Sequence, residues 1–270
     1  MRVFLVYKKM IIIKLKGGLG NQMFQYAYGR KLELSGKKVV FDTSFFKGNK
    51  AKKDAAREFK LNKFNLQTQS SFSDKKHVFL DIFNKIKRNL GFKIKEFYQG
   101  EKYFIAVGEL IRREFTLKKE LSFRAQEILQ KIEKDNSISL HIRRGDYVTN
   151  LKTSAYHGVY GLDYYRAAMK LIKEKISNPI FFIFSDDINW AKENFAGEEF
   201  IFVSSSEIED VEEMILMSKC KHNIIANSSF SWWGAWLNNN LEKVIIAPKK
   251  WFNDKKVAQS EIIPSIWIKI

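Results

Sequence analysis

The run His141-Ile-Arg143-Arg144-Gly145-Asp146 places a histidine, two arginines and an acid almost side by side. A guanidinium group donates hydrogen bonds in a planar fork that matches phosphate or carboxylate oxygens. Two adjacent arginines could therefore hold a diphosphate group, and Asp146 could pair with one of them. An isolated arginine pair is more often a solvated strand end, so this interpretation depends on the rest of the chain.

The residues before the arginines alternate between apolar and polar side chains, which predicts a β-strand. Ile138, Leu140 and Ile142 would face one side of this strand, while Ser139, His141 and Arg143 would face the other. The strand would therefore deliver its polar side chains to the point where the chain turns at Gly145.

Two further polar clusters follow predicted strands, Ser185-Asp186-Asp187 after the apolar run 180–184 and Asn227-Ser228-Ser229 after 222–226. Strands at 200–203 and 242–247 and helices at 163–176, 188–195 and 210–219 complete an alternating pattern. This alternation predicts a doubly wound parallel sheet. In such a sheet ligands bind at the carboxyl ends of the strands, so we expect the three clusters to form one binding crevice.

A second anion-binding loop is predicted near the N-terminus, where Gly17-Gly18-Leu19-Gly20 joins a strand at 10–15 to a helix that Asn21 would cap. Backbone N–H groups and the helix dipole favour an anion at such a place. The loop matches neither the dinucleotide fingerprint nor the P-loop, and by itself it could be a tight turn. A strand at 39–42 would follow this helix.

The length of 270 residues fits two domains, and the turn formers Asp135-Asn136 predict a boundary between domains 1–135 and 136–270.

The single cysteine, Cys220, lies in an apolar-periodic helix and is expected in the core. One cysteine and four histidines without zinc-ligand spacing predict a reducing compartment and no structural metal. No apolar run is long enough to span a membrane, so we expect an unexported soluble protein. Residues 1–9 could reflect the choice of start codon.

The formal charge is +17, and residues 47–95 hold 14 Lys and Arg against 4 Asp and Glu. Such a surplus attracts nucleic acid, an anionic membrane surface or a phosphorylated substrate, or it is simply a solvated lysine-rich surface. No recognisable nucleic-acid-binding module accompanies the charge.

Four segments, taken together and in order, resemble the bacterial α-1,2-fucosyltransferases of glycosyltransferase family 11. They are Gly17-Gly-Leu-Gly-Asn21-Gln22-Met-Phe-Gln-Tyr-Ala27, His141-Ile-Arg-Arg-Gly-Asp-Tyr147, Ser185-Asp-Asp187 and Ile224-Ile-Ala-Asn-Ser-Ser-Phe-Ser-Trp-Trp-Gly-Ala-Trp-Leu237. Their order and spacing fit from about Met10 to Trp251.

The resemblance implies a GT-B-like architecture, with two Rossmann-like domains facing across a cleft. Residues 1–135 would lie on the acceptor side, and residues 136–270 would bind GDP-β-L-fucose. It also implies transfer of fucose, with inversion, to the 2-hydroxyl of a glycan acceptor such as a galactoside in surface glycan synthesis. No cofactor or divalent metal would be required, since the adjacent acids Asp186-Asp187 lack the one-residue spacing of metal-dependent transferases.

On this interpretation Arg143 stabilises the charge that grows on the β-phosphate as the sugar bond breaks. Arg144 would be held by Asp146, and His141 would orient the clamp. Asn21 of the other domain is also predicted to be catalytic, since the amides near Gly20 and Asn21 would close on the pyrophosphate. The remaining predicted ligands are Gly18 and Gly20 from that domain, Asn227, Ser228 and Ser229 at the phosphates, and Asp186 at guanine or ribose. The general base stays open: Asp146 is a candidate, but a carboxylate that is paired with an arginine has a lowered pKa and is a weak base.

Two alternatives remain. A related α-1,6- or O-fucosyltransferase would share parts of these motifs, although the run Ser231-Trp-Trp-Gly-Ala-Trp236 favours the α-1,2 family. A polyanion-binding protein would explain the charge but not the three clusters at the strand ends. For the enzyme we expect a cytoplasmic location, a GDP-fucose donor, a glycan acceptor, no nucleic acid, and peripheral contact of the 47–95 region with anionic membrane.

Overall fold

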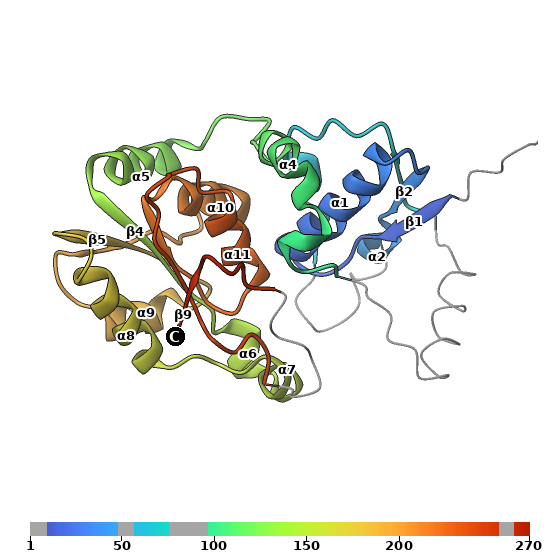
Figure 1. Ribbon diagram of the computed structural model, residues 1–270. Coiled ribbons are helices and arrows are strands. Elements are labelled where there is room, and N and C mark those ends of the chain that lie inside the picture. The colour runs from blue at the N-terminus through green and yellow to red at the C-terminus, as the bar shows by residue number, and fades with distance from the viewer. Residues whose placement is uncertain (1–9, 48–56, 76–96, 254–261) are drawn as a thin grey trace, which may run out of the picture. The chain divides into compact units, whose positions relative to one another are not determined.

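The computed structural model describes residues 10–47, 57–75, 97–253 and 262–270 (Figure 1). The chain divides into two compact units, Met1–Thr116 and Leu117–Ile270. Each unit has its own parallel sheet with helices packed against it. The predicted α/β fold class, with two units that each contain a parallel sheet, is confirmed. None of the described helices is both long and apolar enough to cross a membrane.

The first unit is built on a three-stranded parallel sheet in the order β1-β2-β3. Its elements in chain order are β1 (Ile11–Lys14), α1 (Leu19–Leu34), β2 (Val39–Asp42), α2 (Ser44–Lys47), η2 (Leu61–Lys63), β3 (Ser71–Ser73), η3 (Glu101–Tyr103), η4 (Ile105–Val107) and α4 (Gly108–Glu114). Helix α1 packs so closely on the sheet that a Cβ at Gly29 would overlap the ring of Phe41 on β2.

Helix α1 starts earlier than the sequence indicated. Its N-cap is Gly18, which makes no side-chain capping bond, so the prediction that Asn21 caps the helix was wrong. Asn21 lies instead in the first turn, where its Oδ1 accepts a hydrogen bond from Gln99 Nε2 at 2.7 Å. Gly17 has a φ of +81°, a backbone conformation that glycine adopts without strain and that turns β1 into the helix.

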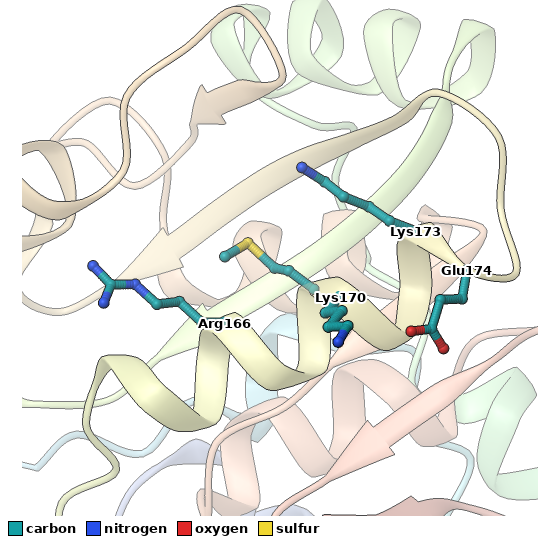
Figure 2. A pocket seen from close by; sticks show the side chains of 5 residues that line it. Arg166, Lys170, Lys173 and Glu174 are labelled. Atoms are coloured by element: carbon teal, nitrogen blue, oxygen red, sulfur yellow. The ribbon is translucent and has the colours of Figure 1, made fainter.

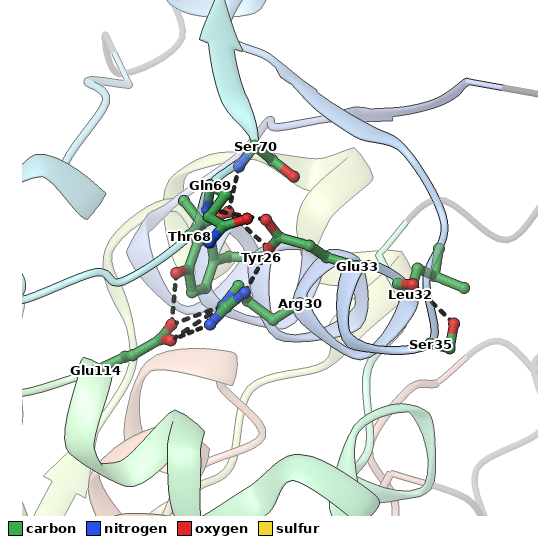
Figure 3. Close-up of polar contacts among 9 residues, drawn as sticks. All are labelled: Tyr26, Arg30, Leu32, Glu33, Ser35, Thr68, Gln69, Ser70 and Glu114. Carbon is green, nitrogen blue, oxygen red and sulfur yellow. Dashed lines mark hydrogen bonds and ion pairs between the residues drawn. The ribbon is translucent and has the colours of Figure 1, made fainter. Parts of the chain in front are cut away.

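A buried ion-pair network joins α1 to the segments that follow β2 (Figure 3). Arg30 on α1 pairs with Glu114 of α4 at 2.7 Å between Nη2 and Oε1, and it also pairs with Glu33. Tyr26 donates its hydroxyl proton to Glu114, while the Thr68 hydroxyl bonds to Glu33. Glu114 is fully buried, and its contacts with both Arg30 and Tyr26 satisfy a charge that would be costly to bury alone.

The second unit contains a six-stranded parallel sheet in the order β6-β5-β4-β7-β8-β9. Its elements are α5 (Phe123–Lys134), β4 (Asn136–Ile142), α6 (Gly145–Thr149), α7 (Leu151–His157), α8 (Leu162–Lys173), β5 (Pro179–Ser185), α9 (Ile188–Asn194), β6 (Phe200–Phe202), α10 (Asp210–Lys219), β7 (His222–Ile224), α11 (Ser229–Trp236), β8 (Ile245–Ala247) and β9 (Ile268–Lys269). This order is that of a doubly wound Rossmann sheet, as the alternating pattern predicted.

The two faces of this sheet are covered by different helices (Figure 1). Ile138, Leu140 and Ile142 pack with α8 and α9 on one face, whereas Phe182 and Phe184 pack with α5 and α10 on the other. The predicted alternation along β4 is therefore confirmed.

The polar face of β4 is also buried, because its hydroxyls bond to the β7 region. Ser137 Oγ accepts from the Lys221 backbone at 3.1 Å, and Ser139 Oγ accepts from Asn223 Nδ2 at 2.7 Å. These two serines therefore hold neighbouring parts of the fold together and are not open to a ligand.

The boundary between the units lies before α5, between Thr116 and Leu117, and not after it at residue 135 as the turn formers suggested. The apolar face of α5, with Ile128 and Ile132, belongs to the core that contains Phe182. A turn marked the end of a helix there and not the end of a compact unit.

The prediction that Cys220 lies in the core is confirmed. Cys220 is buried at the end of α10, and burial raises the pKa of its thiol, as expected for an unreactive core cysteine. Trp232 and Trp233 of α11 are fully buried and pack edge to face, with ring centroids 5.1 Å apart. The tryptophan run therefore serves the core.

Candidate functional site

The order of strands reverses between β4 and β7, and this topological switch point marks the place where doubly wound sheets bind ligands. The loops after β4, β5 and β7 carry the three predicted polar clusters. The structure brings them together: Arg143 contacts Asp186, and the Tyr147 hydroxyl donates to the backbone carbonyl of Asn227 at 3.2 Å. The predicted crevice edge is therefore a single cluster of residues.

Arg143 lies directly after β4 and pairs with Asp186, which follows β5. The distance from Arg143 Nη1 to Asp186 Oδ2 is 2.9 Å, and about a fifth of the arginine side chain is exposed (21%). The guanidinium also lies over the Tyr147 ring, 5.4 Å from its centroid. Arg143 is thus oriented by an acid and an aromatic ring while part of its surface remains accessible.

Arg144 is fixed by the loop after β5. Its backbone N–H donates to Asp186 Oδ1 at 2.8 Å, and its Nε donates to Asp187 Oδ2 at 3.1 Å. Its guanidinium lies 4.1 Å from the centroid of the Trp190 ring. The side chain of Asp146 lies outside the described residues, so its predicted contact with Arg144 stays a prediction.

The close approach of these two loops depends on Gly145. A Cβ at this position would overlap the carboxylate of Asp186. Asp187 in turn caps α9, since its side chain accepts from the Trp190 backbone at 3.2 Å. The two adjacent acids are therefore both engaged in positioning the arginines.

His141 is the last inward polar residue of β4. Burial, followed by the nearby charge of Arg143, lowers the pKa of His141 to about 3, so the ring is neutral at physiological pH. Its Nδ1 is buried and has no hydrogen-bond partner among the described residues. A buried polar atom without a partner is costly, so this nitrogen has an unused hydrogen-bonding capacity that a bound water or a ligand could satisfy.

The cluster after β7 divides into one structural residue and two residues at a helix start. Asn227 is buried, and its Nδ2 donates to the backbone carbonyls of His157 at 2.8 Å and Trp251 at 3.2 Å. Its amide hydrogens are thus directed at the main chain and not at a ligand. Ser228 caps α11 by accepting from the Phe230 backbone, and Ser229 is the first residue of that helix.

Glu213, which lies on α10 near the carboxyl end of β6, was not predicted from the sequence. Burial, opposed by a hydrogen bond from the Ser204 hydroxyl and reinforced by the charges of Asp210 and Asp186, raises the pKa of Glu213 to about 7. Ser204 itself accepts from the Ser185 backbone at 2.9 Å. Acids are common in the first turn of a helix, so no sequence signal distinguished this one.

The glycine loop of the first unit is held by two glutamines from α1. Gln22 Nε2 donates to the backbone carbonyls of Gly17 at 3.1 Å and Glu58 at 2.8 Å, and Gln25 Oε1 accepts from the Lys16 backbone at 2.8 Å. A Cβ at Gly18 would lie 3.7 Å from Arg57 Nη1. No pattern in the sequence distinguishes this arginine beside the loop.

Gly20, the other glycine predicted to bind a ligand, lies in the first turn of α1 and is buried. The loop therefore offers main-chain N–H groups at a helix start together with a neighbouring guanidinium. Both features favour an anion.

An open hollow of about 390 Å³ on the outer surface of α8 has a different character (Figure 2). It is lined by Arg166, Met169, Lys170, Lys173 and Glu174. Lys173 is already paired with Glu199 at 2.9 Å. This hollow lies on a helix face and not at the switch point, and we assign it no role.

Within the described residues, no group of three or more His, Cys, Asp or Glu is arranged to hold a metal ion. Most of the lysine-rich region lies outside the described residues, including Lys50, Lys52 and Lys53. Lys47 is described and pairs with Asp74 at 2.5 Å.

The sequence of this chain is similar to those of known proteins. The sequence matches the family described as Glycosyl transferase family 11 over residues 4–270. It is 34% identical to the O-antigen biosynthesis glycosyltransferase WbnK of Escherichia coli, over 95% of this chain and 99% of that protein. It is 35% identical to an alpha-1,2-colitosyltransferase of Escherichia coli, over 96% of this chain and 98% of that protein.

A galactoside alpha-(1,2)-fucosyltransferase 1 of Leontocebus fuscicollis is 29% identical over 50% of this chain and 40% of that protein. Among solved structures, a glycosyl transferase family 9 protein from Veillonella parvula aligns with a TM-score of 0.41 and 11% identity, covering 89% of this chain and 81% of that one. An Arabidopsis thaliana FUT1 mutant in complex with GDP aligns with a TM-score of 0.45 and 11% identity, covering 88% and 70%.

Proposed function

The chain belongs to glycosyl transferase family 11, and from this premise we propose that it transfers L-fucose from GDP-β-L-fucose to the 2-hydroxyl of a galactoside, with inversion at the fucose anomeric carbon. The observation that carries this proposal is the pair of oriented arginines at the switch point of the second unit. Two of the relatives described above are named for α-1,2 transfer, and one of them for a galactoside acceptor.

The chemistry of transfer needs positive charge at the leaving diphosphate. As the bond between fucose C1 and the β-phosphate oxygen breaks, that phosphate gains negative charge, and the accessible guanidinium of Arg143 would stabilise it. Arg144, tied to Asp187 and Trp190, would keep the loop after β4 in place. The N–H groups at the start of α11, near Ser228 and Ser229, would hold the phosphates through the helix dipole.

The other end of the donor needs hydrogen-bond partners for guanine and ribose. Asp186 and Glu213 lie at the carboxyl ends of β5 and β6 and offer carboxyl oxygens for this purpose. His141 would offer its unpartnered Nδ1. We propose that the start of α1 in the first unit, with Gly18, Gly20 and the neighbouring Arg57, offers main-chain N–H groups and positive charge to the diphosphate.

We propose that the reaction needs no metal ion, because Asp186 and Asp187 are each paired with an arginine, which supplies the positive charge directly. The candidate for the general base that removes the acceptor proton is Asp146, because it follows Arg143 closely in the sequence. An Asp146→Asn variant tests this role, and it should lose transfer while it keeps its affinity for the donor.

Colitosyl transfer is the second candidate, favoured by the 35% identity to an alpha-1,2-colitosyltransferase along nearly the whole chain. Colitose is fucose without its 3-hydroxyl. A site that hydrogen-bonds this hydroxyl would reject the deoxy sugar, whereas a site that leaves it in solvent would accept both.

The test is a donor screen with purified protein and a methyl β-galactoside acceptor. GDP-fucose, GDP-colitose, GDP-mannose and UDP-galactose are compared by released nucleotide, and the product linkage is read by NMR. We expect GDP-fucose to give the highest kcat/KM and an α-1,2 product. Transfer only from GDP-colitose would select the second candidate, and a different linkage or donor would refute both.

The cellular setting follows from the acceptor. We propose that the enzyme acts in the cytoplasm on lipid-linked glycans of the O-antigen kind, and that the 47–95 region contacts the anionic membrane surface. This region holds 14 basic and 4 acidic residues, and the resulting positive charge exceeds what binding one diphosphate requires.

A further inference from the structure

A cluster of aromatic side chains lies beside the glycine loop, at the carboxyl end of β1. Phe97 is 36% exposed, and the ammonium group of Lys16, just after β1, lies 4.9 Å from the centroid of its ring. Because Lys16 directly precedes the loop, the Phe97 ring lies at the sheet edge where α/β units bind ligands.

Tyr98 fixes the backbone on which Phe97 is presented. Its φ of +50° is an uncommon, strained conformation for a residue with a side chain. The Tyr98 ring stacks on Tyr28 of α1, with centroids 4.0 Å apart and an angle of 18° between the planes, and Tyr103 packs against it edge-on. A strained residue held by stacking keeps its two neighbours, Phe97 and Gln99, in fixed positions.

Gln99 adds hydrogen-bonding groups to this aromatic surface. Its Nε2 donates to Asn21 Oδ1 at 2.7 Å, which orients both amides. This bond uses one of the two Gln99 amide hydrogens and none of those on Asn21 Nδ2, and it leaves Gln99 Oε1 as an acceptor. Asn21 and Gln99 are both partly exposed residues. The surface thus combines an exposed ring with oriented amide donors and acceptors.

We propose that Phe97, Gln99 and Asn21 form the binding subsite for the galactoside acceptor. An aromatic ring has a negative face that attracts partially positive C–H groups. The axial 4-hydroxyl of galactose leaves the C–H groups of C3, C4 and C5 on one face of the sugar, which would lie on the exposed part of the Phe97 ring. The amides of Gln99 and Asn21 would bond to its hydroxyls. This assignment rests on the proposed function and names the residues that select its acceptor.

The test measures binding of methyl β-galactoside, in the presence of GDP, by ligand-detected NMR and acceptor KM by turnover. Phe97→Ala should weaken galactoside binding roughly tenfold and raise the acceptor KM to the same extent, because the stacking contact is lost. Phe97→Trp should retain binding, and Gln99→Ala should weaken it. Ile105→Ala, which removes another exposed apolar side chain, from η4, should leave binding unchanged. GDP affinity should be the same in all four variants.

Absence of galactoside binding to the wild-type protein, or equal binding by Phe97→Ala and Ile105→Ala, would overturn the assignment. A parallel loss of GDP affinity in Phe97→Ala would overturn it as well, by placing the nucleotide on the ring. Galactoside binding that depends on Phe97 without transfer from any of the screened donors would support the subsite and refute the proposed function, so the two failures are distinguishable.

Discussion

Arg143 and Asp186 form an ion pair that joins the loops after β4 and β5, with 2.9 Å between Nη1 and Oδ2. The pair is partly exposed, and such pairs contribute little to stability. Asp186 also accepts from the backbone N–H of Arg144, so it fixes the arginine loop as well as the guanidinium. The arrangement therefore orients the Arg143 side chain and its loop more than it stabilises the fold.

Replacement of Arg143 by lysine is therefore expected to lower kcat roughly 100-fold, because an ammonium group is a point charge and cannot provide the planar fork that a phosphate accepts. Steady-state transfer from GDP-fucose measures this, with circular dichroism as the folding control. Arg166→Lys on the surface of α8 makes the same chemical change elsewhere and should have no effect. Turnover of the Arg143 variant close to wild type would remove this residue from the reaction.

The Gly145→Ala variant tests the close approach of the two loops. A methyl group there would overlap the Asp186 carboxylate, so either the ion pair or the loop must move, and we expect a loss of activity of about tenfold or more. Gly161→Ala is the matched control, because a Cβ added at Gly161 would meet nothing within 4 Å. Equal activities of the two variants would show that the loop tolerates the shift.

Glu213 predicts a pH dependence of stability. Its pKa is raised from 4.5 to about 7 in the folded protein, so the native state holds a proton that the unfolded state releases. The free energy of unfolding should therefore fall as the pH rises from about 4.5 through 7, by roughly 2–3 kcal/mol, and then level off. Urea unfolding between pH 4.5 and 8 measures this slope. In the Glu213→Gln variant this contribution should be absent. If the variant shows the same slope as the wild-type protein, Glu213 is not the source of the pH dependence.

The buried network of the first unit predicts a large loss of stability on removal of one charge. Glu114→Gln leaves Arg30 buried with only Glu33 as its ion-pair partner in the network, which should cost about 3–5 kcal/mol. Lys47→Met removes an exposed pair with Asp74 and should cost less than about 1 kcal/mol. Thermal denaturation compares the two variants. A Glu114 variant as stable as the Lys47 variant would mean that Arg30 finds another partner.

Local patterns in the sequence were sufficient to predict strands β4 to β8 of the second unit and the three clusters at strand ends, since alternation and apolar runs reflect burial directly. The short C-terminal strand β9 was not predicted. They did not predict which partners the polar residues choose. Asn227 looked like a phosphate ligand, yet its amide bonds to main-chain carbonyls that are distant in sequence.

The start of α1 was also misplaced, because Asn21 has the residue type of an N-cap, whereas the actual N-cap is Gly18 and the turn is made at Gly17. The same limit explains Glu213, Arg57 and Phe97, whose roles depend on neighbours that only the folded chain brings together. The boundary between the units was misplaced for a similar reason. The sequence does not show which unit the apolar face of α5 packs against, whereas in the structure it packs in the core that contains Phe182.

The charge surplus of the 47–95 region predicts electrostatic binding to anionic lipid. Lys50, Lys52 and Lys53 lie outside the described residues, and the prediction rests on their charge alone. Each lysine near an anionic membrane contributes about 1 kcal/mol at low salt, so replacing all three by glutamate should abolish binding to vesicles that contain anionic phospholipid. Transfer to soluble methyl β-galactoside should change little.

The matched control replaces Lys170, Lys173 and Lys175 of the α8 region by glutamate, which changes the net charge equally at another place and should leave vesicle binding largely intact. Cosedimentation at low and at physiological salt measures both variants, and binding should weaken as salt rises. If both triple variants lose binding to the same extent, the overall charge of +17 and not the 47–95 region attracts the membrane. If transfer to the soluble acceptor collapses in the first variant alone, those lysines act on the substrates, because a membrane contact is not needed for a soluble acceptor.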